Sequence, residues 1–105
     1  MSDAAIKRKL KQYAALLRKH HVPVKNVYLF GSYTTGSVHK HSDIDVAIVV
    51  RRMPKNAFAV ESRMWILAPE VDTRIEPILL AEKELHTYSA STMGNEVKKT
   101  GVRIV

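Results

Sequence analysis

The sequence has 105 residues, of which 46% are hydrophobic and none is cysteine. This length predicts a single domain, covering residues 1–105, with one modest core. The lack of cysteine excludes disulfides, thiolate zinc sites and cysteine nucleophiles, and it is typical of a reducing cytoplasm. With no run of about 18 apolar residues and no signal-peptide pattern, we expect a cytoplasmic protein without a membrane span. The 17 basic and 10 acidic residues give a net charge of +7, which favours a polyanionic partner such as a nucleotide, a nucleic acid or an acidic protein surface.

The N-terminal segment carries the pattern of an amphipathic helix. Apolar residues recur at spacings of three and four positions along residues 3–20, and the residues between them are mostly charged. Ser2 or Asp3 is suited to cap the first turn, because its side-chain oxygen can accept from the free backbone N–H groups there. We therefore expect one long helix with a buried stripe and a solvated basic face.

Two predicted strands follow the helix. Val27 to Phe30 is a short apolar run that ends at Gly31, and Ile44 to Val50 is strongly β-branched. Residues 32–37, which lie between the strands, can start a helix or form a turn.

The second half of the chain alternates helical and strand patterns. One helical face runs from Ala57 to Ala68 and ends at Pro69, with Phe58 and Trp65 on a neighbouring stripe. Side chains on such a stripe usually flank the core, and an exposed partner-binding surface is the alternative. The remaining predicted elements are a strand over residues 71–80, one or two short helical pieces within 82–99, and a last short strand over 102–105. Strands alternating with helices indicate an α/β layer structure.

Asp43 and Asp45 enter the second strand where the pattern calls for apolar packing. Because side chains alternate along a strand, both carboxylates point to the same face. Two neighbouring carboxylates repel each other, and burying them without a cation is costly. A divalent metal removes the conflict, and magnesium prefers carboxylate and phosphate oxygens. Taken alone, an Asp-x-Asp pair more often caps a loop and faces water.

The Gly31-Ser32 turn upstream of the aspartates suits phosphate binding. It follows a strand and precedes a possible helix, so backbone N–H groups are free and Gly31 has no Cβ to block an approaching phosphate. The commoner phosphate loops do not apply, because Ser37 stands where a Walker motif needs lysine and no GxGxxG occurs. What remains is Gly-Ser, ten residues, and then Asp-x-Asp.

This pattern resembles the signature of the nucleotidyltransferase superfamily that includes DNA polymerase β. The match is to its minimal form, often called MNT, and it runs through essentially the whole chain, although the motifs outside residues 30–50 are weaker. The resemblance implies the nucleotidyltransferase fold, an α/β (α+β) arrangement in which helices flank a small mixed β-sheet.

The family pattern also requires a third carboxylate on a later strand, and Asp72 and Glu76 are the two candidates. They share strand parity but lie roughly 13 Å apart at about 3.3 Å per residue, whereas paired catalytic metals are about 4 Å apart, so only one can serve. Glu76 is our prediction, because it lies inside the apolar strand while Asp72 is at its polar start. Glutamate departs from the usual aspartate, and Pro77 beside it suggests an edge strand or a strand end.

The resemblance implies transfer of a nucleoside monophosphate from a nucleoside triphosphate, most simply AMP from ATP, with pyrophosphate leaving. Asp43, Asp45 and Glu76 would be the catalytic residues and the ligands of two magnesium ions. Gly31 and Ser32 would bind the outer phosphates of the nucleotide. Ser42 would orient Asp43.

Larger relatives carry a helical domain that binds the acceptor, so we expect a separate protein to supply those contacts here. By resemblance, that protein is a small helical HEPN toxin, and the chain is the antitoxin of a type VII-like toxin–antitoxin pair that adenylylates a toxin tyrosine. Its docking surface would be the basic first helix or the stripe of Phe58 and Trp65. A non-catalytic module that neutralises its partner by contact is one alternative, and a transferase acting on a small molecule is another. Specific nucleic-acid binding has only the charge in its favour.

Overall fold

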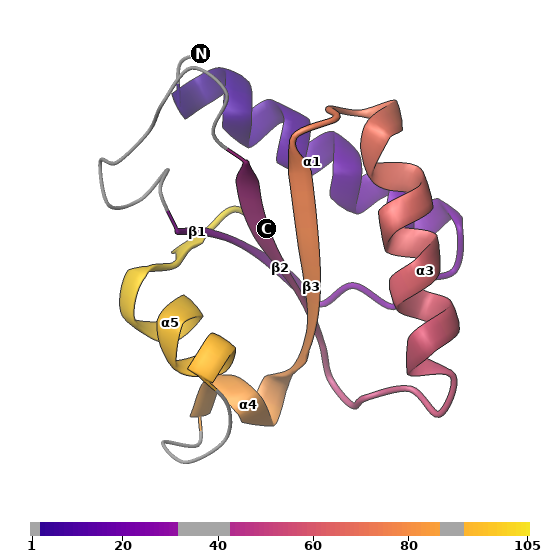
Figure 1. The fold of residues 1–105 in the computed structure, drawn as a ribbon, viewed down its shortest axis with the longest axis vertical. Helices are drawn as coiled ribbons and strands as arrows, with labels where there is room; N and C mark the ends of the chain where they lie inside the picture. The colour runs from indigo at the N-terminus through magenta and orange to yellow at the C-terminus, as the bar shows by residue number, and fades with distance from the viewer. Residues whose placement is uncertain (1–2, 32–42, 87–91) are drawn as a thin grey trace.

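The structure, a computed structural model, describes residues 3–31, 43–86 and 92–105. Its elements in chain order are helix α1 (Asp3–Lys19), strands β1 (Asn26–Phe30) and β2 (Ile44–Val50), helix α3 (Ala57–Leu67), the 3₁₀ turn η1 (Ala68–Glu70), strand β3 (Ile75–Ala81), helices α4 (Glu82–His86) and α5 (Thr92–Thr100), and strand β4 (Val102–Arg103). Within these ranges the strands form a four-stranded sheet in the order β3-β2-β1-β4 (Figure 1). Strand β2 is parallel to β3, and β1 is antiparallel to both β2 and β4, which confirms the expected small mixed sheet flanked by helices.

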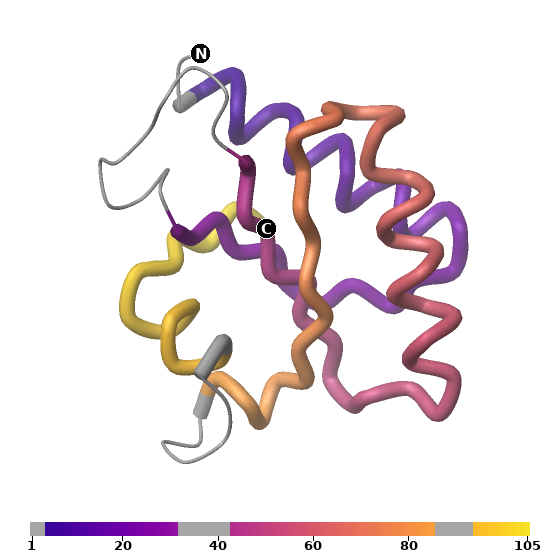
Figure 2. Tube along the Cα trace, in the orientation of Figure 1, coloured from indigo at the N-terminus to yellow at the C-terminus, as the bar shows by residue number. Residues whose placement is uncertain are grey.

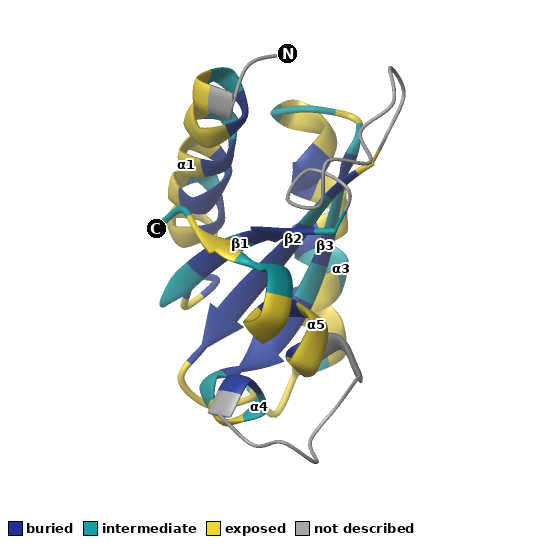
Figure 3. Ribbon diagram, turned by 90° about the vertical axis from the view of Figure 1, so that its left-hand side faces the viewer, coloured by how far each residue is buried: buried dark blue, intermediate teal, exposed yellow. Residues whose placement is uncertain are grey.

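Helix α1 forms as the apolar spacing predicts. Its buried stripe faces the sheet, and its exposed side carries most of its lysines and arginines (Figure 3). The helix ends at Lys19, and in the turn that follows, His21 has a left-handed φ of 67°. The backbone N–H of Val22 donates to the carbonyl oxygen of Leu17 at 2.9 Å and closes the end of the helix. The predicted capping residues cannot be compared with the structure: Ser2 lies outside the described residues, and only the backbone of Asp3 is described.

Helices α1 and α3 cover one face of the sheet. The apolar residues of alternate strand positions pack against them there, and the buried side chains that form this core are Ile6, Leu10, Tyr13, Ala14, Leu17, Val22, Val24, Val27, Leu29, Ile44, Val46, Ile48, Val50, Val60, Met64, Leu67, Ala68, Ile75 and Leu79. The hydroxyl of Tyr13 donates to the carbonyl oxygen of Met64 at 2.8 Å and so joins the two helices. Burial raises the pKa of Tyr13 and keeps its phenol neutral.

The opposite face of the sheet carries a smaller core under α4 and α5. Its buried members are Phe30, Ala47, Val49, Leu80, Leu85 and Val97. The end of the chain returns alongside β1 at the edge of the sheet, and Figure 2 shows its trace. There the backbone N–H of Val27 donates to the carbonyl oxygen of Val105 at 3.2 Å. Because side chains alternate along each strand, Asp45 and Glu76 share this second face with the smaller core.

Strand β3 begins later than the sequence predicts. The expected strand starts at Val71, but the chain turns first, because the Asp72 carboxylate accepts from the backbone N–H of Arg74 at 2.9 Å. The strand then starts at Ile75. It is the edge strand next to β2, which agrees with Pro77, since proline has no N–H to offer to a further strand.

The outer side of α3 exposes large apolar side chains. Phe58 is 84% exposed, Ile66 72% and Trp65 51%. The prediction that Phe58 and Trp65 flank the core is therefore wrong, because both are exposed, while the alternative of a partner-binding surface stays a prediction. No helix within the described ranges is long and apolar enough to cross a membrane.

Candidate active site

Gly31 closes β1 in a backbone conformation that favours glycine. Its φ is +75°, a left-handed value that other residues seldom adopt. A Cβ built at this position would overlap Oδ2 of Asp45, so the glycine also makes room for that carboxylate. Gly31 at the end of β1 therefore packs closely against Asp45 near the start of β2. This agrees with the strand register, in which the preceding residue, Phe30, pairs with Asp45.

Strand β2 brings both aspartates to the same end of the sheet. Asp43 is exposed and immediately precedes the strand, while Asp45 is partly buried as its second residue. The backbone N–H of Ile44 donates to the carbonyl oxygen of Arg74 at 2.8 Å, which fixes the start of β2 against the start of β3. Ile44 itself points into the core under α1 and α3, so its two neighbours face the other way.

Glu76 lies beside the aspartates because β2 and β3 are parallel. It is directly paired with Asp45 in the register of the two strands and is partly buried. Its side chain lies within hydrogen-bonding reach of Asp43. The position inside the apolar strand, which favoured Glu76 over Asp72, thus corresponds to a real proximity, whereas the role of Glu76 in chemistry stays a prediction.

Burial, together with the crowding of negative charge, raises the pKa of two of these groups. The pKa of Glu76 is raised first by desolvation and then by the charges of Asp43 and Asp45. The pKa of Asp45 is raised by desolvation, by Asp43 and by Glu96 of α5. An arrangement of this kind favours a cation, because neutralising the charge removes the repulsion.

Asp72 lies outside this cluster of carboxylates. Its side chain is only 7% exposed and forms ion pairs with Lys9 at 2.7 Å and with Arg74 at 2.8 Å. The hydrogen bond from Arg74 and then that from Lys9 hold the pKa of Asp72 well below its usual range, despite its burial. With its charge already satisfied, Asp72 connects α1 to the turn before β3.

The oxygen donors at this end of the sheet suit magnesium by their chemistry, since Mg²⁺ prefers carboxylate and phosphate oxygens and usually completes its shell with substrate. Among the described residues, no group of three or more histidine, aspartate or glutamate side chains has the spacing of a ready-made metal site. Ser32 and Ser42, the other predicted site residues, lie outside the described residues.

Glu96 is the residue that sequence reasoning missed. It lies in α5, is exposed, and acts on Asp45 through its charge. Its local sequence, an acidic residue among lysines, is that of any solvated helix face. Only the packing of α5 against β1 brings it near the aspartates, so no signal in the sequence identifies it.

Comparison with solved structures identifies close folds. A chain of a toxin–antitoxin complex crystallised with AMP-PNP is 27% identical, with a TM-score of 0.64, and the match covers 94% of this chain and 72% of that one. A putative nucleotidyltransferase from Sulfolobus solfataricus is 19% identical with a TM-score of 0.63, and the match covers 98% and 87% of the two chains. The toxin–antitoxin MntA–HepT contains a chain that is 22% identical with a TM-score of 0.54, covering 92% and 69%. At these last two identities the likeness concerns the fold.

Comparison of the sequence with protein families gives a match that spans most of the chain. A search of curated proteins found no match. The family model described as nucleotidyltransferase domain matches residues 8–99, which include Gly31, both aspartates and Glu76. The chain therefore belongs to the nucleotidyltransferase domain family.

Proposed function

We propose that this protein transfers AMP from ATP to a tyrosine of a partner HEPN toxin and so acts as the antitoxin of the pair. The observation that carries the proposal is the pairing of Asp45 with Glu76 across parallel strands, with Asp43 beside them and Gly31 packed against Asp45. Three carboxylates around a glycine turn suit a nucleotide that carries magnesium.

The reaction follows from what each group can do. The acceptor oxygen forms a bond to the α-phosphorus while the bond from that phosphorus to the bridging oxygen breaks, so pyrophosphate leaves with the electron pair. Glu76 takes the proton of the acceptor hydroxyl and passes it to water. Asp43, Asp45 and Glu76 would hold two magnesium ions, which neutralise the charge that develops on the phosphate oxygens.

Gly31 and the predicted Ser32 would bind the outer phosphates of ATP, and Ser42 would orient Asp43. Gly31 supports this role because it offers a left-handed turn without a Cβ beside the carboxylates. Both serines remain sequence-based assignments.

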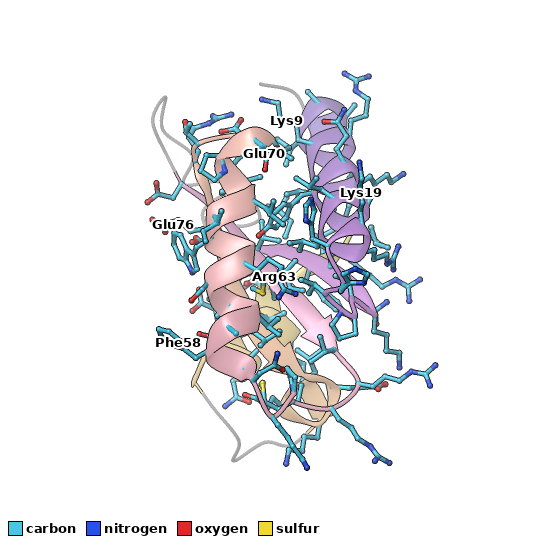
Figure 4. All side chains as sticks on the ribbon, turned by 90° about the vertical axis from the view of Figure 1, so that its right-hand side faces the viewer. Lys9, Lys19, Phe58, Arg63, Glu70 and Glu76 are labelled. Atoms are coloured by element: carbon cyan, nitrogen blue, oxygen red, sulfur yellow. The ribbon has the colours of Figure 1, made fainter. Side chains whose placement is uncertain are left out.

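The acceptor protein would approach over α3. In Figure 4, Phe58 and Glu76 project on the same side of the molecule, so the exposed apolar side of α3 borders the carboxylate face. Exposed apolar patches of this kind are typical of protein interaction sites. The relatives crystallised as toxin–antitoxin complexes support a toxin as the partner.

The test is transfer of label. The protein is incubated with magnesium, α-labelled ATP and the protein encoded by the adjacent gene, and the variant that combines Asp43→Asn with Asp45→Asn is the control. We expect label on a tyrosine of the partner with the wild-type protein and none with the variant. Label that persists in the variant would contradict the assigned site.

A second candidate function is neutralisation of the partner by contact alone, and the apolar stripe of Phe58, Trp65 and Ile66 favours it. The same double variant separates the two functions. If it still neutralises the toxin in cells and no label appears with the wild-type protein, binding alone explains the antitoxin activity.

A further inference from the structure

A cavity opens on the face of the sheet that carries the carboxylates. Its volume is about 160 Å³, and it is lined by Tyr28, Leu85, Val97, Lys98 and Gly101. It lies between β1 and the helices α4 and α5, so its walls are mostly apolar and one of them is an aromatic ring. Sites for whole small molecules usually measure about 300–1,000 Å³, so this cavity suits one part of a larger ligand.

The distance between the cavity and the carboxylates indicates which part of the ligand the cavity binds. Tyr28 pairs with Ala47 in the strand register, and Phe30 pairs with Asp45. Tyr28 is therefore two residues from the Asp45 position on the same face of the sheet, roughly 7 Å along the strands. In a nucleotide, the sugar separates the α-phosphate from the base by a distance of this size.

Helix α5 lies beside both the cavity and the carboxylates. Its Glu96 is near enough to Asp45 for their charges to interact, and the next residue, Val97, lines the cavity. Gly101, directly after the helix, completes the lining just before β4 pairs with β1. One short helix thus borders both the carboxylates and the cavity.

We propose that the cavity is the base subsite of the nucleotide, with the ring of Tyr28 stacking on a purine. Apolar walls remove water from the faces of the base, and the aromatic ring of Tyr28 offers a flat surface on which the base can stack. A purine offers the larger surface for stacking, which makes ATP and GTP better ligands than CTP and UTP. The inference rests on the proposed function, because it assumes that the triphosphate lies at Gly31 and the carboxylates.

Binding measured by calorimetry with magnesium tests the subsite. The probes are ATP and inorganic tripolyphosphate, which has no base, and the variants are Tyr28→Leu and Tyr28→Phe. Stacking of a base on an aromatic ring predicts that Tyr28→Leu weakens ATP binding by about 5- to 100-fold. Tyr28→Phe keeps the ring and should change ATP affinity by less than about threefold. Tripolyphosphate should bind equally to all three proteins.

Wild-type protein that binds ATP no more tightly than tripolyphosphate would overturn the subsite, as would Tyr28→Leu with unchanged ATP affinity. If Tyr28→Leu fails to fold, the ring resonances of Tyr28 in the wild-type protein decide by NMR, because they should shift on addition of ATP and stay in place with tripolyphosphate. Failure of AMP transfer with intact base-dependent binding would overturn the proposed reaction and leave the subsite standing. Transfer without base-dependent binding would do the reverse.

Discussion

Asp72 and Glu76 lie four residues apart, yet their surroundings are opposite. The Asp72 carboxylate accepts hydrogen bonds from Lys9 and from the side chain and backbone of Arg74, and these donors lower its pKa. Glu76 meets the carboxylates of Asp43 and Asp45, and its pKa is raised. The charge of Asp72 is neutralised by cationic side chains of the protein itself, whereas Glu76 lies next to further negative charge.

The difference separates stability from function. A carboxylate whose pKa is lowered by folding stabilises the folded state when ionised, and one whose pKa is raised destabilises it. Asp72 therefore contributes to the fold. Glu76 and Asp45 lower the stability of the protein alone, and a bound cation would relieve this cost. Clusters of this kind are typical of functional sites.

The largest effect on the reaction rate should come from removing the charge of Glu76, with removal of the charge of Asp72 as the comparison. We expect Glu76→Gln to lower the rate of pyrophosphate release in the presence of the acceptor by about 100- to 10,000-fold, as expected for loss of a general base. Asp72→Asn, assayed well below its melting temperature, should stay near the wild-type rate. The opposite pattern, a fully active Glu76→Gln and an inactive Asp72→Asn, would make Asp72 the third acid of the site.

Most of the fold follows from the sequence, because hydrophobic spacing is a local signal. The stripe of α1 and the β-branched run of β2 indicate their elements to within about a residue. The start of β3 does not follow, since the turn depends on the side chain of Asp72 accepting from Arg74. The exposure of Phe58 does not follow either, because the periodicity of a helix does not say which of its neighbouring stripes the rest of the chain covers.

The site divides in the same way. Asp43, Asp45 and Gly31 form a recognisable pattern because they are close in sequence, and the position of Glu76 inside an apolar strand distinguishes it from Asp72. The proximity of Glu96 to Asp45 depends on tertiary packing alone. So does the pairing of Asp72 with Lys9, which are 63 positions apart.

Substitution of Gly31 tests whether the turn and Asp45 are coupled. Gly31→Ala should cost about 1–3 kcal/mol of stability because of its positive φ. It should also lower the transfer rate about 100-fold, because the new Cβ displaces the Asp45 carboxylate. Unfolding in urea measures the first effect and initial rates measure the second.

Gly31→Asn is the matched variant, because asparagine tolerates the left-handed conformation and still brings a Cβ. If contact with Asp45 is what matters, Gly31→Asn regains part of the stability but remains as slow as Gly31→Ala. Recovery of the full rate would show that the backbone conformation alone is important.

The stability of Asp72 variants tests the inference that Asp72 stabilises the fold. Asp72→Asn should lower the free energy of unfolding by about 1.5–3 kcal/mol, the range for hydrogen bonds between charged groups. Because folding lowers the pKa of Asp72, its contribution is present above the pKa of the unfolded chain and is lost as the pH falls toward that of the folded state. The difference between wild type and variant, measured in urea, should thus shrink with acidification.

Glu70→Gln is the control for this experiment, since Glu70 is exposed in the turn just before Asp72. It should change the free energy of unfolding by less than about 0.5 kcal/mol. A Glu70 effect as large as that of Asp72 would mean that net charge near the turn, and not the ion pairs with Lys9 and Arg74, stabilises it.

The smallest effect should have the opposite sign. Folding raises the pKa of Glu76, so its contribution to stability decreases as the pH rises from the pKa of the unfolded chain through that of the folded state. Glu76→Gln should therefore melt slightly higher than wild type in EDTA at neutral pH, on a scale of about 4–8 °C for each kcal/mol of repulsion removed. Magnesium should raise the melting temperature of the wild type more than that of the variant, because a bound cation relieves the same repulsion. If Glu76→Gln melts lower in EDTA and magnesium stabilises both proteins equally, Glu76 is a structural acid like Asp72, and the contrast between the two disappears.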